Sequence, residues 1–448
     1  MNEHLSLSTA TLLTPLRHGL RAGADNTVDI LVRVQAPDAP ASAPNSSVSM
    51  AERPPQALAL VIDRSGSMEG RPLTEAKRCA AFVVSRLRPS DAVSVVAFDN
   101  RVQRLWPAIA LGSGDAVRGA IGRIEAGGST DLHGGWLEGA DTLSAVAGAG
   151  LKRVILLSDG GANYGMVDPD LIAEQCTAWA ARGITTSTYG LGNTFNEELM
   201  VSMARAGGGN HYYGDTADDL MEPFEQELAL LDNLALRQVE LSASGAEGLT
   251  VEMLNALPVS GSGWRLPDLA WGAEAWALLR VTVPVKAMPA LGKLLSVLRV
   301  SVTGQSLQGE PVALERVGLA LPVLSPASFD ALVRVELVAR RGQEVAAAEV
   351  LNQMRTAAQA MDWVLVDRLL AEAEAAFAGN EWVAGMLEAM GGVARSRSQK
   401  RMMKEALYSS SRLNARLASK DEGQFSLDAA QPVPAYLRRK KLQGKGEL

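Results

Sequence analysis

The sequence predicts an α/β protein: a doubly wound, mostly parallel six-stranded sheet, a small antiparallel β-sandwich and a C-terminal helical region. Over residues 56–231, apolar strand-like runs alternate with amphipathic helical stretches, as in a parallel sheet covered by helices on both faces. Short β-type runs separated by Gly, Ser and Pro follow over residues 232–326, which favours the sandwich. Residues 327–420 carry Ala, Leu, Glu and Arg at helical spacing, which favours a helical hairpin or bundle.

The order of the predicted strands matters for function. In the usual order of a doubly wound sheet, 3-2-1-4-5-6, the first and fourth strands are neighbours, and ligands bind beyond their carboxyl ends. We expect the six strands at residues 57–63, 92–98, 102–106, 153–159, 185–191 and 210–213. The loops after residues 63 and 159 should therefore meet in one crevice.

The segments outside this region have simpler assignments. Residues 1–35 are predicted to be irregular up to a strand at 27–34, which we expect to join the sandwich. Residues 36–55 are rich in Pro, Ala and Ser and should form a linker. Residues 421–448 are polar and basic, as in a tail.

Composition and net charge argue against some classes of function. At 448 residues the chain is expected to hold two or three domains. A net charge of −7 argues against nucleic acid as the main partner, and four histidines leave little for a metallohydrolase with imidazole ligands. We find no apolar run long enough for a membrane span and no secretion leader, so we expect a cytoplasmic protein.

Hard oxygen ligands gather at the end of the first predicted strand, in the run Asp63-Arg64-Ser65-Gly66-Ser67. One carboxylate and two hydroxyls at alternate positions can point to a single divalent cation. Gly66 allows the tight turn that lets both hydroxyls face the same way. This run therefore predicts half of a metal site.

Two later segments offer the other half. Asp159 ends the fourth predicted strand. Thr130 lies earlier in the chain, in a Gly-rich loop before the helix predicted to start near Leu132. Ser129 and Asp131 flank Thr130, and either is able to cap that helix; we favour Thr130 as the ligand and Asp131 as the cap. The predicted ligands are Asp63, Ser65, Ser67, Thr130 and Asp159.

These five groups leave an octahedral ion incompletely coordinated. Mg²⁺ or Mn²⁺ takes six oxygens, and Ca²⁺ is an alternative with a larger shell. Two carboxylates balance the charge of the ion only formally, so the ion stays electrophilic and its open position suits an added anion. A carboxylate of Asp or Glu from a partner protein is the natural further ligand.

The five residues and the strand order resemble the metal-ion-dependent adhesion site (MIDAS) and fold of the von Willebrand factor type A (VWA) family, a Rossmann-like fold. The resemblance covers residues 56–231. The layout is similar to bacterial members and to calcium-activated chloride channel-like and inter-alpha-trypsin-inhibitor heavy-chain-like proteins. It implies a metal-dependent interaction module, with Ser65, Ser67 and Thr130 bound directly and one or both aspartates through water. By analogy it implies an adaptor or scaffold, beside an AAA+ ATPase or a kinase or phosphatase system.

Two other functions remain open. A strand-terminal Asp beside Mg²⁺ also occurs in phosphohydrolase-like enzymes, but these usually carry a second Asp two residues later, where this chain has Ser65. Phosphate loops and nucleophile elbows are missing from the sequence. The other alternative is a scaffold whose metal is purely structural. We expect no catalytic residues and no organic cofactor.

Overall fold

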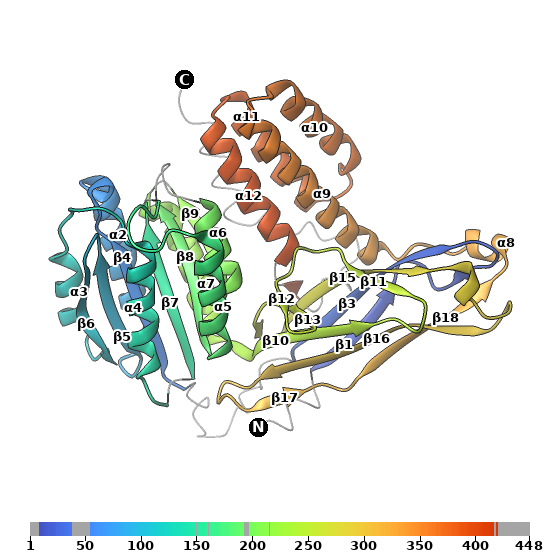
Figure 1. Cartoon of the computed structure of the whole chain (residues 1–448), viewed down its shortest axis with the longest axis horizontal. Helices are drawn as coiled ribbons and strands as arrows, with labels where there is room; N and C mark the ends of the chain where they lie inside the picture. The colour runs from blue at the N-terminus through green and yellow to red at the C-terminus, as the bar shows by residue number, and fades with distance from the viewer. Residues whose placement is uncertain are drawn as a thin grey trace, which may run out of the picture. The chain divides into compact units, whose positions relative to one another are not determined.

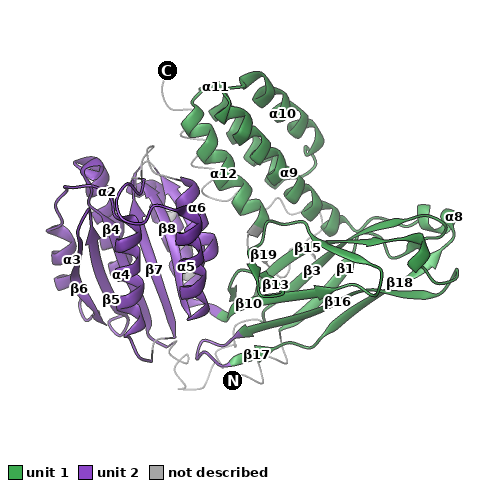
Figure 2. Cartoon of the chain, viewed as in Figure 1, with its two compact units in different colours: residues 1–39, 235–304, 311–448 green, residues 40–234, 305–310 purple. Residues whose placement is uncertain are grey.

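The computed structural model describes residues 9–37, 54–148, 150–159, 161–191, 197–214, 216–415 and 418–419. The chain divides into two compact units (Figure 2). Unit 2 comprises residues 40–234 and 305–310, and unit 1 comprises residues 1–39, 235–304 and 311–448. Each unit is described by itself.

Unit 2 is built on a six-stranded sheet with five parallel strands and one antiparallel edge strand (Figure 1). Across the sheet the strands are β6 (Val102–Ala110), β5 (Ala92–Phe98), β4 (Gln56–Asp63), β7 (Leu151–Ser158), β8 (Ile184–Leu191) and β9 (Gly208–Gly214). In chain order this is 3-2-1-4-5-6, as predicted. The edge strand β6 returns antiparallel to β5 because only a short turn joins them.

Helices cover both faces of this sheet because its strands are apolar on both sides. All residues of β4 are buried, with Leu58, Leu60 and Ile62 facing one core and Ala57, Ala59 and Val61 facing the other. The first core is closed by α2 (Arg71–Arg86), α3 (Asp115–Gly122) and α7 (Ala217–Asp232). The second core is closed by α4 (Leu132–Ser144), α5 (Pro169–Ala181) and α6 (Glu197–Ala206).

Unit 1 contains two sheets around one apolar core. The first sheet consists of β1 (Ala10–Pro15), β3 (Asn26–Gln35), β15 (Ala273–Val283) and β11 (Thr250–Met253), with β19 (Ala418–Ser419) beside β15. The second consists of β12 (Val259–Ser260), β13 (Gly263–Arg265), β10 (Leu234–Ser244), β16 (Leu294–Gln305), β18 (Val317–Leu324) and β2 (Leu20–Arg21), with β14 (Leu269–Ala270) beside β10 and β17 (Pro311–Ala313) beside β16. A 3₁₀ turn, Val285–Ala287, follows β15.

The C-terminal part of unit 1 is helical. Its helices are α8 (Pro326–Asp330), α9 (Glu336–Gln359), α10 (Trp363–Ala376), α11 (Glu381–Arg395) and α12 (Gln399–Ala415). Helices α9 to α12 share an apolar core, and α9 also meets the first sheet, where the Arg341 guanidinium lies 4.7 Å from the Trp276 ring centroid. The predicted fold class, with its α/β sheet, antiparallel sheets and terminal helices, is confirmed.

Two sequence expectations need comment. The region before residue 27 is not irregular, because β1 pairs along its whole length with β3, from Ala10 with Gln35 to Pro15 with Ile30. Its residues show little alternation of their own, so this strand depends on pairing that the sequence pattern does not reveal. The predicted tail at 421–448, and all of the predicted linker at 36–55 except residues 36–37 and 54–55, lie outside the described residues.

No helix in the described part of the chain combines the length and the apolar character that a membrane crossing requires.

Candidate metal centre

The candidate site lies where β4 and β7 end side by side. These strands pair in parallel, with Ile62 opposite Leu157, so Asp63 and Ser158 both stand at the carboxyl edge of the sheet. The polar residues that follow each strand therefore converge beyond that edge.

Two hydrogen bonds hold Asp63. The carboxylate is fully buried; its Oδ1 accepts a 2.8 Å bond from the Ser65 amide and its Oδ2 accepts a 2.5 Å bond from the Ser158 hydroxyl. The first bond is a local turn that carboxylates favour after a strand. The second fixes the carboxylate from the neighbouring strand.

The hydroxyls of Ser65 and Ser67 lie on the same side of the turn. Their Oγ atoms are 3.2 Å apart, and Ser67 Oγ donates a 2.9 Å hydrogen bond to Oδ1 of Asp159. Ser67 is exposed, whereas Ser65 and Asp159 are buried. The structure thus brings together four of the five predicted ligands by direct contacts or through Ser158.

The Gly-rich loop is tied to this turn through its backbone. The Gly127 amide donates to the Arg64 carbonyl at 2.8 Å, and the Gly66 amide donates to the Gly128 carbonyl at 2.9 Å. Gly128 has φ +79°, and a Cβ there would lie 2.4 Å from the side chain of Asn100. Only glycine therefore fits this close approach.

Thr130 is positioned by the loop that follows Asp159. Its amide donates to Asn163 Oδ1 at 2.8 Å, and its carbonyl accepts from the amides of Asn163 and Tyr164, both at 3.2 Å. The threonine is buried, and its hydroxyl makes no hydrogen bond within the described ranges. Asp131 caps α4 by accepting from the Gly134 amide at 2.9 Å, as predicted. The loop contacts bring Thr130 to the site, but its side chain touches none of the other four predicted ligands through a hydrogen bond.

The electrostatic environment of Asp63 and Asp159 favours the binding of a cation. Burial raises the pKa of Asp63 to about 6, against the hydrogen bonds from Ser158 and Ser65, and the charge of Asp159 raises it further. Burial also raises the pKa of Asp159. Two carboxylates that are costly to ionise beside one another gain most from a cation between them.

The donor set fits a hard cation. Within the part of the chain that the structure describes, no three His, Cys, Asp or Glu side chains are grouped so that they could hold a metal. A cation at the sheet edge would therefore be bound by two carboxylates together with hydroxyls, which are the oxygen ligands of Mg²⁺, Mn²⁺ or Ca²⁺.

Sequence reasoning missed Ser158. Its hydroxyl orients Asp63 without being a predicted ligand itself. The only signal was its place directly before Asp159, at the end of a strand that lies beside β4. Asn163 has a similar supporting role, because its side chain accepts from the Thr130 amide.

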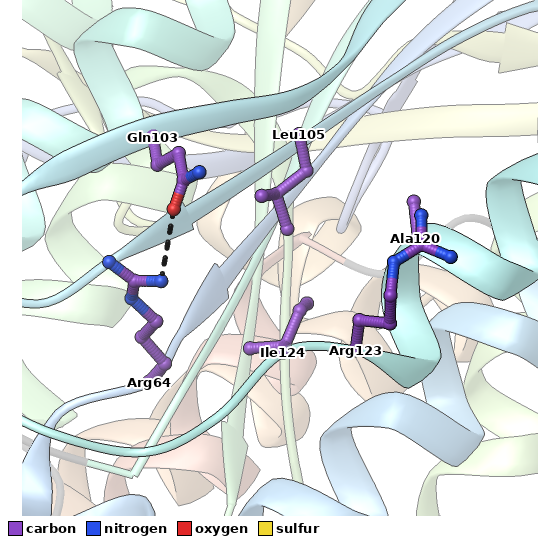
Figure 3. Close-up of a pocket in the computed structure, with 6 residues that line it drawn as sticks. All are labelled: Arg64, Gln103, Leu105, Ala120, Arg123 and Ile124. Atoms are coloured by element: carbon purple, nitrogen blue, oxygen red, sulfur yellow. Dashed lines mark hydrogen bonds between the residues drawn. The ribbon is translucent and has the colours of Figure 1, made fainter.

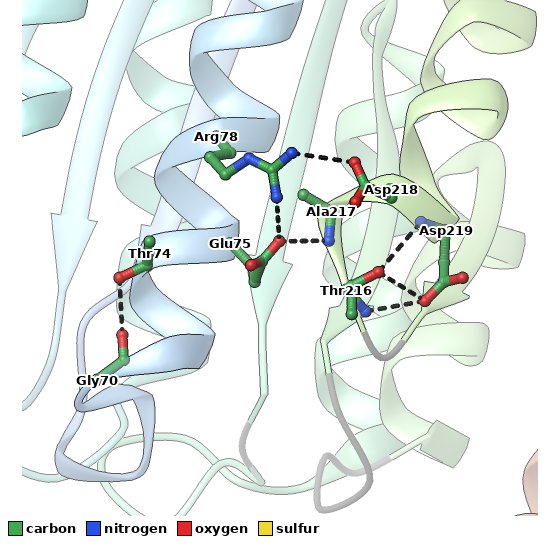
Figure 4. A network of polar contacts seen from close by, with 8 residues as sticks. All are labelled: Gly70, Thr74, Glu75, Arg78, Thr216, Ala217, Asp218 and Asp219. Carbon is green, nitrogen blue, oxygen red and sulfur yellow. Dashed lines mark hydrogen bonds and ion pairs between the residues drawn. The ribbon is translucent and has the colours of Figure 1, made fainter. Parts of the chain in front are cut away.

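The helix that leaves the site is anchored at its start (Figure 4). Ser67 lies in the 3₁₀ turn Gly66–Met68, which leads into α2. There Glu75 Oε2 accepts a 2.7 Å bond from the Ala217 amide at the start of α7, and Arg78 joins Glu75 to Asp218, with both contacts at 3.0 Å. The loop that carries Ser65 and Ser67 is thereby held against the rest of unit 2.

Comparison with known proteins decides the family of this unit. Residues 57–226 match the model of the von Willebrand factor type A domain. These residues form a VWA domain. VWA domains are commonly metal-dependent protein interaction modules, and their MIDAS motifs bind divalent cations.

The similarity to relatives covers only part of each protein. The chain is 32% identical over 183 residues to the uncharacterized protein YfbK of Escherichia coli, covering 40% of this chain and 31% of that protein. It is 28% identical over 197 residues to inter-alpha-trypsin inhibitor heavy chain H1 of Mesocricetus auratus, covering 41% of this chain and 21% of that protein. The chain thus spans less than half the length of these relatives.

A solved structure is similar over most of the chain. A von Willebrand factor type A protein from Catenulispora acidiphila superimposes with a TM-score of 0.69 at 17% identity, covering 90% of this chain and 96% of that chain. At this identity the similarity concerns the fold alone. It includes regions outside the VWA domain as well as the domain itself.

Proposed function

We propose that this protein is a non-enzymatic adaptor or scaffold that binds a partner protein through a divalent cation at the MIDAS. The cation, Mg²⁺ or Mn²⁺ with Ca²⁺ as an alternative, would be held by Asp63, Ser65, Ser67, Thr130 and Asp159. The single observation that carries the proposal is the contact of Ser67 with both Ser65 and Asp159, which joins two loops around one point.

Each residue has a definite part in this proposal. The Ser65, Ser67 and Thr130 hydroxyls are neutral ligands, so they leave the positive charge of the cation undiminished. Asp63 is held by Ser158 and by the Ser65 amide, and Asp159 is held by Ser67. A bound cation supplies electrostatic attraction for a carboxylate. The exposed side of Ser67 leaves room for an Asp or Glu of the partner.

Affinity capture tests this function. The full chain, loaded with Mg²⁺, is immobilised and used to capture proteins from the cells that produce it, and EDTA is used for elution. We expect a partner that EDTA releases, that Asp63→Ala does not capture, and that loses binding when one of its own acids is changed to the amide. Asp115→Ala, an exposed aspartate on α3, is the matched control.

Capture that is unaffected by EDTA and by Asp63→Ala would contradict the proposal. A phosphatase assay with generic phosphate esters and Mg²⁺ addresses the enzyme alternative. Sustained turnover that Asp63→Ala abolishes would favour a hydrolase instead. By family analogy, AAA+ ATPases and kinase or phosphatase systems are the first partners to examine.

A further inference from the structure

A pocket of about 260 Å³ opens in unit 2 beside the turn that carries Ser65 and Ser67 (Figure 3). It is formed by the loop after β4, the edge strand β6 and the end of α3. Its lining residues are Arg64, Gln103, Leu105, Ala120, Arg123 and Ile124. None of them belongs to the MIDAS.

The pocket and the MIDAS share their loops. Arg64 stands between Asp63 and Ser65, and its carbonyl accepts from the Gly127 amide. Arg123 and Ile124 lie just before the same Gly-rich loop that leads to Thr130. The pocket is thus built in part from the same backbone that carries the predicted metal ligands.

The two arginines of the pocket differ in their surroundings. Arg64 is fixed, because its Nε lies 3.1 Å from Asp99 Oδ2 and its Nη1 donates to Gln103 Oε1 at 3.2 Å. Arg123 is exposed, and its guanidinium makes no ion pair or hydrogen bond with any described residue. The six lining residues thus include two guanidinium groups and no carboxylate, and Asp99 pairs with only one of the two, so the pocket carries a net positive charge.

Figure 3 shows the arrangement of these groups. Arg64 and Gln103 lie on one side, Arg123 lies on the other, and Leu105 and Ile124 lie between them. A guanidinium binds a carboxylate through paired hydrogen bonds. An apolar floor between two cations suits an acid that reaches it on a short hydrocarbon stem.

We propose that this pocket is a second carboxylate subsite, which takes a glutamate side chain of the partner segment whose other acid binds at the MIDAS cation. The inference rests on the proposed function and extends it. An extended segment advances about 3.3–3.6 Å per residue, so the two acids would lie a few residues apart at a fixed spacing. The partner motif is then a pair of acids, not a single acid.

A display library of random short peptides tests the subsite. The full chain is immobilised with Mn²⁺, and the peptides that EDTA releases are sequenced. We expect the wild-type chain to enrich peptides with two acids at one fixed spacing. Arg123→Glu should keep the acid at the cation, replace the second acid by Lys or Arg, and bind the wild-type peptides at least about tenfold more weakly.

A control variant carries the same charge reversal outside the pocket. Arg118→Glu reverses a charge on α3, outside the pocket, and should select the wild-type peptides. If Arg123→Glu also selects the wild-type peptides, the subsite is wrong while cation-dependent binding stands. If the wild-type chain yields no acidic peptides that EDTA releases, the proposed function fails, and the subsite fails with it.

Discussion

The hydroxyl of Ser67 donates a 2.9 Å hydrogen bond to the carboxylate of Asp159, although the two residues are 92 positions apart in the chain. The contact exists because β4 and β7 are neighbours in the sheet and end at the same edge. It joins the loop after β4 to the loop after β7 at the point where the MIDAS cation would be bound.

Loss of the Ser158 hydroxyl should weaken cation binding. Ser158→Ala leaves one buried oxygen of Asp63 without its donor, which costs about 1–3 kcal/mol and frees the carboxylate to rotate. We expect Mn²⁺ affinity, measured by isothermal titration calorimetry, to fall about tenfold. Ser94→Ala is the control, because it also removes a buried hydroxyl, which donates to the Trp106 carbonyl on β6, away from Asp63. Equal Mn²⁺ affinities for the two variants would show that Ser158 does not position Asp63.

A methyl group at Gly128 should displace the Gly-rich loop. The Cβ of Gly128→Ala would lie 2.4 Å from Asn100 Oδ1, on a backbone with φ +79° that alanine disfavours. We expect a loss of stability of at least about 1 kcal/mol and a clear loss of Mn²⁺ affinity. Gly127→Ala is the matched control, since its Cβ would meet nothing within 4 Å. A Gly128→Ala variant that binds Mn²⁺ as the wild type does would separate this loop from the site.

A buried ion pair holds α7 against the sheet. Arg153 of β7 and Glu227 of α7 form an ion pair with side chains 1% and 0% exposed. Glu227 also accepts hydrogen bonds from Ser187 at 2.7 Å and Asn210 at 2.6 Å. Because Glu227→Gln leaves Arg153 buried without its counter-charge, we expect it to destabilise unit 2 by about 3–5 kcal/mol at neutral pH.

Hydrogen exchange at the amides of β7 and β8 measures the loss of stability that Glu227→Gln causes in these strands. Glu225→Gln is the control on the same helix, because Glu225 pairs with Arg86 at the surface, where both side chains are 53% exposed. We expect that change to alter stability by less than about 1 kcal/mol. Similar exchange rates in the two variants would mean that the buried pair does not stabilise the unit.

The same pair predicts a pH dependence. Burial alone would raise the pKa of Glu227, but Arg153 and the hydrogen bonds from Ser187 and Asn210 outweigh it, so the pKa lies below the ordinary 4.5. A lowered folded-state pKa stabilises the protein fully above the unfolded-state value, and this contribution is lost as pH falls below it. The stability difference between wild type and Glu227→Gln should therefore shrink as pH falls below about 4.5. A difference that stays constant, or grows, between neutral pH and pH 4 and below would contradict this assignment.

Local patterns predicted the part of the fold that positions the MIDAS. The buried runs ending at Asp63 and Asp159 are continuous in the chain, and the preference of doubly wound sheets for one strand order places them together. The predicted order is confirmed by the pairing of β4 with β7. The cap at Asp131 was also predictable, because it depends on a residue three positions later.

What the sequence did not reveal depends on contacts between distant segments. Strand β1 exists through its pairing with β3, and Ser158 has a role only because β7 lies beside β4. The pocket at Arg123 likewise requires α3 and β6 to meet the loop that carries Arg64. Arg64 stands between Asp63 and Ser65, and its residue type alone indicated no function.

Anomalous diffraction from crystals of the full chain grown with Mn²⁺ tests the central claim most directly. We predict one strong manganese peak beyond the ends of β4 and β7, within bonding distance of the Ser65 and Ser67 hydroxyls and beside Asp63, Thr130 and Asp159. Crystals of Asp63→Ala should lose that peak. Ordered loops with no manganese between them, or a peak elsewhere in the chain, would contradict the account.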